Sequence, residues 1–430
     1  MRMKPLTDFR EFRQFLASFT NYERLPTFRY DSRTLGLERM RSFVHDLGDP
    51  QNAYPCVHVG GTKGKGTTTL MLEALLGADG ARVGTYTSPH IEHLCERIRV
   101  GGVPISRDDI VAAANATLVA LERRLGSPDF PTFFELMTAI AMLHFSKEAV
   151  DYAIFEVGLG GRLDATNILS ARWSALTSVG LEHTDLLGDS LAQIATEKAG
   201  IIRPSTPVVC GELPTEALEV VAAVAEERGA PLVETRSDDV VVGADGTVRI
   251  EGLDRPVRAH RVRGPGLRTD LAIAWSLYRR ILADDHREPA FDTVGRVLEE
   301  LELPARVEMF DGRLPVCLDG AHTTESINAL ATALDEIEMP RPRTLVFSLA
   351  SDKRCAEILA RLDAVGDDLI FTLADPVRSL TPEDLRDAFG RGEVIEDPDA
   401  ALDEALARDK PVVITGSIYL AGRLRKRLRG

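Results

Sequence analysis

Short apolar runs alternate with longer helical patterns along the first part of the chain. The runs that predict strands are 57–60, 83–87, 152–157 and 175–179, and the stretches that predict helices include 67–76 and 133–145. Strands that alternate with helices of this length favour a parallel sheet with helices on both faces. The pattern therefore predicts an α/β fold.

The pattern changes after residue 232. Residues 232–263 alternate polar and apolar positions over shorter runs, and a turn at 244–246 suggests a hairpin insertion. A helix is expected to end near Leu282, and an acidic stretch with proline follows it. A second strand and helix series then begins, with strands at 316–318, 345–347, 369–373 and 412–415 and a helix start marked by Thr381 and Pro382.

These boundaries predict two domains. Residues 1–285 form a large N-terminal P-loop-type domain with a parallel sheet, 286–303 a linker, and 304–430 a smaller C-terminal Rossmann-like α/β domain. The second domain has no G-x-G-x-x-G segment, so a dinucleotide cofactor is not expected.

Composition excludes several kinds of partner. A formal charge of −15 opposes a phosphate-backbone interface, and no stretch is apolar for long enough to cross a membrane. The five cysteines are widely spaced and include no C-x-x-C pair, as is typical of a reducing compartment. We expect a cytoplasmic monomer that binds small molecules and neither nucleic acid nor membrane.

A glycine-rich segment, G-G-T-K-G-K-G-T, lies at 60–67 between a predicted strand and a predicted helix. Backbone N–H groups of such a loop surround phosphate oxygens, while Lys65 reaches the β- and γ-phosphates and Thr67 can bind Mg²⁺. The predicted ATP-binding residues here are Gly61, Thr62, Lys63, Gly64, Lys65, Gly66 and Thr67. Gly66 separates the lysine from the threonine, so the loop is a variant of the usual pattern, and a simple tight turn is the alternative interpretation.

Further segments agree with this loop. They are T-S-P-H at 87–90, E-R-I at 96–98, T-F-F-E at 132–135, E-V-G-L-G-G-R-L-D-A-T-N at 156–167, G-L-E-H-T-D at 180–185, E-K-A-G-I-I at 197–202, D-G-A-H at 319–322 and G-S at 416–417. Their order and spacing resemble the folylpolyglutamate synthase and dihydrofolate synthase family of the Mur ligase superfamily. The resemblance covers nearly the whole chain.

The resemblance implies a magnesium cluster, with two sites. It implies that Ser88, Glu156 and His183 bind Mg²⁺ and that Lys198 is carbamylated, which would make it an anionic oxygen ligand. Taken alone, His183 is also compatible with a hydrogen-bonded loop histidine and Glu156 with an ion-pair partner at a strand end. Lys198 alone is compatible with a solvated lysine at a helix end.

The resemblance also implies the substrate contacts. The matching positions for the pteroate group are Thr132, Phe133, Phe134, Leu163, Asp164 and Ala165, although core packing alone also explains the two phenylalanines. In the second domain, Arg306 and Asp319 would complete the nucleotide site, His322 would lie close to the incoming glutamate, and Ser417 would contact substrate. An ion pair and helix capping remain alternatives for these positions.

The activity implied is an ATP-dependent amide ligase that adds L-glutamate to dihydropteroate, to (tetrahydro)folate or to both through an acyl phosphate. A Mur-type ligase acting on a different carboxylate or amino acid is the alternative, and a regulatory P-loop protein without ligase activity is a third hypothesis. Asp270 stands where the family pattern has an asparagine that contacts adenine, which leaves adenine recognition open. Lys198 carbamylation and the choice of acceptor also stay open.

Overall fold

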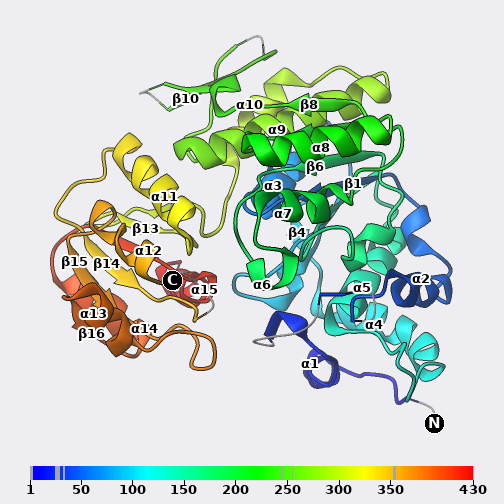
Figure 1. Cartoon of the computed structure of the whole chain (residues 1–430), viewed down its shortest axis with the longest axis horizontal. Helices are drawn as coiled ribbons and strands as arrows, with labels where there is room; N and C mark the ends of the chain where they lie inside the picture. Colours follow the sequence, from blue (N-terminus) through cyan, green and yellow to red (C-terminus); the bar gives the residue numbers. More distant parts are fainter. Residues whose placement is uncertain are drawn as a thin grey trace. The chain divides into compact units, whose positions relative to one another are not determined.

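A computed structural model describes residues 3–24, 30–31, 34–243, 246–253, 255–351 and 355–429 of the chain. The chain forms two compact units (Figure 1). One comprises residues 1–90, 94–258 and 269–300, and the other comprises 91–93, 259–268 and 301–430. The stretch 286–303, expected to be a linker, contains helix α10 (Phe291–Glu300), which belongs to the first unit.

The first unit is built on an eight-stranded sheet with the order β4-β3-β2-β5-β1-β6-β7-β8. Its strands are β1 (Cys56–Gly60), β2 (Val83–Tyr86), β3 (Ile98–Val100), β4 (Val103–Pro104), β5 (Tyr152–Glu156), β6 (Trp173–Leu176), β7 (Val208–Cys210) and β8 (Leu232–Glu234). The six strands from β2 to β8 in this order pair in parallel, and β3 and β4 pair antiparallel at one edge. The predicted parallel sheet is confirmed.

Helices cover both faces of this sheet. The helices of the first unit are α1 (Phe9–Leu16), α2 (Leu37–His45), α3 (Lys65–Ala78), α4 (Arg107–Glu122), α5 (Phe133–Lys147), α6 (Thr184–Leu187), α7 (Leu191–Ala199), α8 (Thr215–Glu227), α10 and most of α9 (Gly264–Asp284). Gly84 on β2 lies against Phe145 of α5, while its neighbour Thr85 donates a hydrogen bond to Glu73 of α3 at 3.1 Å. Because neighbouring strand residues point to opposite faces, α3 and α5 lie on opposite sides of the sheet.

Two predicted boundaries in this unit differ from the structure or fall outside it. The strand predicted at 175–179 is wrong at its carboxyl end, because β6 stops at Leu176 and the next residues bond to the glycine-rich loop. The hairpin insertion predicted at 232–263 is wrong at its amino end, where β8 belongs to the main sheet, and its remainder forms a small sheet of β9 (Val240–Val242), β10 (Thr247–Ile250) and β11 (Val257–Arg258). Its predicted turn includes Ala244 and Asp245, which lie outside the described residues.

The second unit has a six-stranded sheet with the order β12-β13-β17-β14-β15-β16. The strands are β12 (Glu308–Phe310), β13 (Val316–Leu318), β14 (Thr344–Phe347), β15 (Asp368–Phe371), β16 (Glu393–Val394) and β17 (Val412–Thr415), and the helices are α11 (Thr324–Glu336), α12 (Cys355–Leu359), α13 (Pro382–Phe389), α14 (Pro398–Ala407) and α15 (Ile418–Leu428). All neighbours are parallel except β12 and β13. The predicted start of α13 is confirmed, since Pro382 is its first residue and the Thr381 side chain accepts a bond from the Asp384 N–H.

The apolar core of the second unit has two parts. One packs around Phe347 and Phe371, and the other around Ile414 and Leu424. Within the described parts of the chain, none of the helices combines the length and apolar character that crossing a membrane requires.

Candidate functional site

The glycine-rich loop lies between β1 and α3 at the carboxyl end of the sheet. Gly61 and Gly64 have φ angles of +144° and +86°, which residues other than glycine rarely adopt. The Lys65 ammonium donates to the carbonyl oxygens of Gly61 at 3.1 Å and Thr62 at 3.3 Å. The loop therefore has the backbone form and the lysine of a phosphate-binding loop.

Lys198, at the end of α7, shares one of these oxygens with Lys65. Its ammonium donates to the Gly61 carbonyl at 3.0 Å, and its side chain is almost fully buried. Burial, with the nearby Lys65 ammonium, lowers the pKa of Lys198 to about 7. A substantial fraction of this amine is therefore neutral at neutral pH. At the start of this helix, Ser190 and Gln193 form a capping box.

Glu156 ends β5 beside the same loop. Its side chain accepts a hydrogen bond from the Ser88 N–H at 2.9 Å, and a Cβ atom added to Gly66 would lie 3.3 Å from one of its oxygens. Glu156 as a whole is 5% exposed. The structure thus brings Lys65, Lys198, Glu156 and Ser88 together around one loop.

The segment after β6 is bonded along the glycine-rich loop. The Thr62 N–H donates to the Ser178 carbonyl at 2.8 Å, and the Gly180 N–H donates to the Thr62 hydroxyl at 3.0 Å. His183, farther along this segment, has a φ of +53°, an uncommon conformation for a residue with a side chain. Its carbonyl accepts from the N–H groups of Leu186 and Leu187 in the single turn of α6.

The aromatic pair at the start of α5 is divided between two environments. Phe133 is buried, with the Arg97 guanidinium 5.3 Å from its ring centre. Phe134 is partly exposed and lies against Gly158, where an added Cβ would be 2.6 Å from the ring. Thr132 uses its hydroxyl to cap the helix. Of the two rings, only that of Phe134 is therefore accessible enough to contact a ligand.

Asp164 holds a turn in place. Its carboxylate accepts from the N–H groups of Gly158 at 3.0 Å and Leu159 at 2.9 Å, and also from Thr166. Burial raises the pKa of this carboxyl group. Leu163 and Ala165 on either side are buried. These bonds fix the segment that follows Glu156.

Two residues with structural roles at this site, Arg97 and His58, were not assigned by the sequence interpretation. Arg97 donates two bonds to Glu23, at 2.8 and 2.7 Å, and one to His90 at 3.0 Å. His58 on β1 contacts the Thr166 hydroxyl at 2.8 Å, and burial lowers its pKa to about 3. Arg97 lies within the quoted E-R-I segment, whereas no local pattern distinguishes His58.

Asp270, near the start of α9, lies against the glycine-rich loop. A Cβ atom on Gly64 would be 2.0 Å from its carboxylate oxygen, and the Thr68 hydroxyl donates to it at 3.4 Å. This contact gives a second reason, besides the φ angle, for glycine at position 64.

In the second unit, the predicted residues gather around the ends of β13 and β17. Asp319 accepts from the N–H groups of Val307 at 2.8 Å and Ala321 at 2.7 Å, and burial raises its pKa while Arg306 partly opposes the rise. Ala305 and Val307, on either side of Arg306, have φ angles of +53° and +45°. Such conformations cost energy in non-glycine residues, so the surrounding structure must hold this turn.

The other two predicted residues of this unit occupy helix starts. The His322 ring bonds to the Gly320 carbonyl at 2.7 Å, just before α11. Ser417 caps α15 through its hydroxyl. Helix capping thus accounts for Ser417 within the described contacts.

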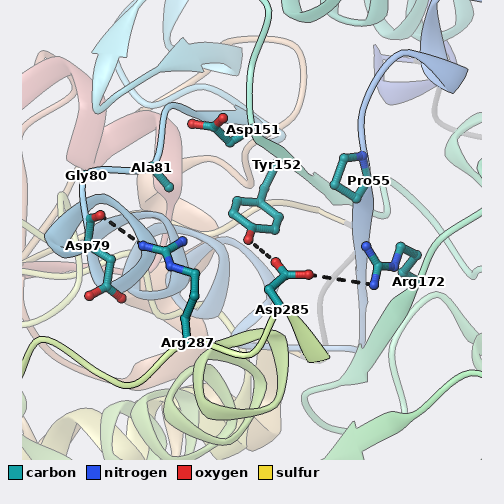
Figure 2. Close-up of a pocket in the computed structure, with 9 residues that line it drawn as sticks. All are labelled: Pro55, Asp79, Gly80, Ala81, Asp151, Tyr152, Arg172, Asp285 and Arg287. Atoms are coloured by element: carbon teal, nitrogen blue, oxygen red, sulfur yellow. Dashed lines mark hydrogen bonds and ion pairs between the residues drawn. The ribbon is translucent and has the colours of Figure 1, made fainter. Parts of the chain in front are cut away.

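A small cavity of about 310 Å³ lies at the opposite, amino end of the sheet in the first unit. Figure 2 shows Tyr152 and Arg172 directed toward Asp285, and Arg287 reaching the Asp79 backbone. Burial and Asp285 raise the pKa of Tyr152 to about 12. Charged groups here pair with one another, and none of the predicted site residues lines this cavity.

Together, the parallel sheet, the glycine-rich loop and its lysine define a nucleotide-binding α/β protein of the P-loop class. A family model described as the Mur ligase glutamate ligase domain matches residues 305–418. The Bacillus subtilis dihydrofolate synthase/folylpolyglutamate synthase is 32% identical over 92% of this chain and 95% of its own length. The Lacticaseibacillus casei folylpolyglutamate synthase is 33% identical over 91% of this chain and 94% of its own.

Solved structures agree. A Mycobacterium tuberculosis folylpolyglutamate synthase complexed with ADP superposes with a TM-score of 0.87 at 28% identity, covering 98% of both chains. An Escherichia coli relative solved with DHPP and ADP gives 0.82 at 28% identity over 99% of each chain. The chain belongs to the folylpolyglutamate synthase and dihydrofolate synthase family of Mur ligases, as its motifs predict.

Proposed function

We propose that this chain is an ATP-dependent ligase that joins L-glutamate to dihydropteroate, to a tetrahydrofolate or to both. The observation that carries the proposal is the grouping of Lys65, Lys198 and Glu156 around one glycine-rich loop, in a chain of this family. Such a loop binds the phosphates of a nucleotide, and relatives of similar length have been solved with ADP.

The chemistry that this grouping supports is activation of a carboxylate by phosphorylation. The acceptor carboxylate oxygen attacks the γ-phosphorus of ATP, the bond to the β-phosphate oxygen breaks, and ADP leaves. The glutamate amine then attacks the acyl carbon, the C–O bond to phosphate breaks, and the amine loses a proton to solvent. Lys65 would neutralise negative charge on the transferred phosphoryl group, and the loop N–H groups would orient it.

We propose that residues around the loop hold two magnesium ions. Thr67, Ser88 and Glu156 offer oxygen atoms, the donors that Mg²⁺ prefers, and His183 would add a nitrogen. Among the described residues, no three His, Cys, Asp or Glu side chains gather as a metal site, so the proposed set depends on hydroxyl groups and on Lys198. When bound, the ions would offset the charge that develops on the phosphoryl oxygens.

Lys198 fits this role only after modification. As an ammonium it would repel a cation, whereas a carbamate on the same nitrogen would be an anionic oxygen ligand. The lowered pKa of Lys198, about 7, supplies the neutral amine that reacts with carbon dioxide. We therefore include carbamylated Lys198 in the proposed metal set.

For the acceptor, we propose that a pterin ring stacks on Phe134, the more accessible aromatic ring, with Thr132, Phe133, Leu163, Asp164 and Ala165 forming the wall around it. Asp164 would act mainly through the turn that it holds, because four hydrogen bonds already engage its carboxylate. In the second unit, we propose Arg306 and Asp319 for the nucleotide and His322 and Ser417 for glutamate.

The test is a comparison of two acceptors under identical conditions. The purified chain is incubated with ATP, Mg²⁺ and L-glutamate plus either dihydropteroate or tetrahydrofolate. The masses of the products are then measured by mass spectrometry. A mass gain of one glutamate residue, with equal release of ADP and phosphate, is the expected result. Activity only with other carboxylates or amino acids would favour the alternative Mur-type ligase, and ADP binding without any turnover would favour a regulatory protein.

We also propose a cytoplasmic monomer. Support for the compartment comes from the cysteines, all five of which are free thiols. Size-exclusion chromatography with light scattering tests the oligomeric state.

A further inference from the structure

One ion pair connects the glycine-rich loop to the segment that carries His183. The Lys63 ammonium lies 2.8 Å from a carboxylate oxygen of Glu182, and the two side chains are 32% and 13% exposed. Lys63 precedes Lys65 by two positions, and Glu182 immediately precedes His183. The pair therefore joins the loop proposed to bind the phosphates to the segment whose His183 is proposed to bind Mg²⁺.

Other bonds already hold the near part of this segment. The Ser178 hydroxyl accepts from the Lys63 N–H at 2.8 Å and donates to the Lys63 carbonyl at 3.0 Å. Together with the bonds of Thr62 to Ser178 and Gly180, these bonds attach the segment that follows β6 to the glycine-rich loop as far as residue 180. Glu182 lies beyond that point, and its contact with Lys63 extends the attachment to the residue next to His183.

The backbone of His183 needs such an attachment. Its φ of +53° is unfavourable for a residue with a side chain, by about 1 kcal/mol or more, and persists only where neighbours hold it. On the carboxyl side the first turn of α6 accomplishes this, through bonds to the His183 carbonyl. On the amino side, the Glu182 N–H donates to the Gly180 carbonyl at 3.0 Å, and the Lys63–Glu182 ion pair adds a side-chain attachment to the glycine-rich loop.

We propose that Lys63 and Glu182 are a pair of positioning residues that fix the His183 segment against the phosphate-binding loop and so set the affinity for nucleotide. In this role Lys63 acts through Glu182 and does not contact phosphate. The inference rests on the proposed function for its ligand, a nucleoside diphosphate or triphosphate.

The test is a double-mutant cycle read on ADP affinity by calorimetry, with KM for ATP and for the acceptor measured alongside. The variants are Lys63→Met, Glu182→Gln, both together, and the exchanged pair Lys63→Glu with Glu182→Lys. Lys147→Met is the matched control, because it breaks an exposed ion pair to Asp109, also 2.8 Å long, between α5 and α4 of the same unit.

We expect each single change to weaken ADP binding and raise KM for ATP by about tenfold, and the double variant to lose no more than the worse single change. The exchanged pair should return to within about threefold of the parent, with melting temperatures within about 3 °C and KM for the acceptor unchanged. Raising the salt concentration should reduce the difference in ADP affinity between the parent and the double variant, since the ion pair is partly exposed and is screened by salt. Lys147→Met should bind ADP like the parent.

Two results would overturn the inference. If Glu182→Gln binds ADP as tightly as the parent while Lys63→Met does not, Lys63 contacts phosphate directly. If the single losses add in the double variant and the exchanged pair does not recover, the residues act independently. Because ADP affinity is read without acceptor, a chain that binds ADP but joins no glutamate would reject the proposed function and still decide this inference.

Discussion

The two ends of the eight-stranded sheet both carry charged side chains, but the partners of those side chains differ. At the amino end, Asp285 contacts Tyr152 and Arg172, and Asp79 accepts from Tyr278 at 2.6 Å. At the carboxyl end, Lys65 and Lys198 both donate to the Gly61 carbonyl. At the first end the carboxylates are engaged by tyrosine hydroxyls and an arginine, whereas at the second end two lysine ammonium groups share one backbone oxygen of the glycine-rich loop.

This difference shows how the same residue types serve stability in one place and chemistry in another. A hydrogen bond from the Trp173 indole to Asp284 and the ion pair of Arg172 with Asp285 attach the end of α9 to the sheet, and groups that are paired in this way offer little to a ligand. Burial, together with the nearby Lys65 ammonium, raises the free-energy cost of charging Lys198, as its lowered pKa indicates. A bound anion would reduce that cost. The cavity at the amino end is therefore not where we expect the reaction.

Substitution at the loop lysine should have the largest effect. Lys65→Ala removes the charge proposed to stabilise the transferred phosphoryl group, so kcat/KM should fall about 1,000-fold. The assay for this fall in kcat/KM is the rate of glutamate-dependent phosphate release. Arg172→Ala, at the opposite end of the sheet, is the control and should change kcat/KM by less than about threefold; a similar loss in both variants would contradict the contrast between the two ends.

Lys198→Ala should reduce kcat by about 100-fold, because a proposed metal ligand is lost. The modification itself is testable without turnover. With ¹³C-labelled bicarbonate, a carbamate signal is expected in the carbon NMR spectrum of the parent and not of Lys198→Ala. The signal should weaken below pH 7, where the amine becomes protonated. If the parent is fully active but shows no carbamate signal, Lys198 is not a ligand of the proposed metal site.

His58 should make folding stability depend on pH. The folded pKa is about 3 and the ordinary value is 6.5, so between these values the unfolded chain binds a proton that the folded chain does not. The contribution of neutral His58 is complete above pH 6.5 and is lost as the pH falls toward 3. From pH 6.5 to 5 it amounts to about 2 kcal/mol.

Urea unfolding at the two pH values measures this contribution. His58→Gln keeps a polar group near Thr166 but cannot titrate, so its stability should fall less between pH 6.5 and 5. Equal losses in parent and variant would mean that His58 is not the group responsible, and carboxylates common to both proteins cancel in the comparison.

The smallest effect is expected at the amino end. Asp285→Asn weakens the contacts to Tyr152 and Arg172 and should lower the free energy of unfolding by about 1 kcal/mol. Its kcat/KM should stay within about twofold of the parent. A large loss of activity without loss of stability would give this cavity a functional role after all.

Much of the fold could be predicted from local sequence. The strands at 57–60, 152–157 and 412–415 were found because fully buried parallel strands leave short apolar runs. The start of α13 was found because Thr381 and Pro382 act through neighbouring backbone. The glycine-rich loop was found because its conformation requires glycine at 61 and 64.

What only the tertiary structure decided are the contacts between distant segments. Four features depend on residues more than 80 positions apart that the fold brings together, in part through the parallel pairing of β1 with β6. They are the end of β6 at Leu176, the place of Asp270 against Gly64, the link from Lys63 to Glu182 and the burial that depresses the Lys198 pKa. Such pairings leave no periodic trace in the sequence, because a parallel sheet joins segments through crossovers of variable length.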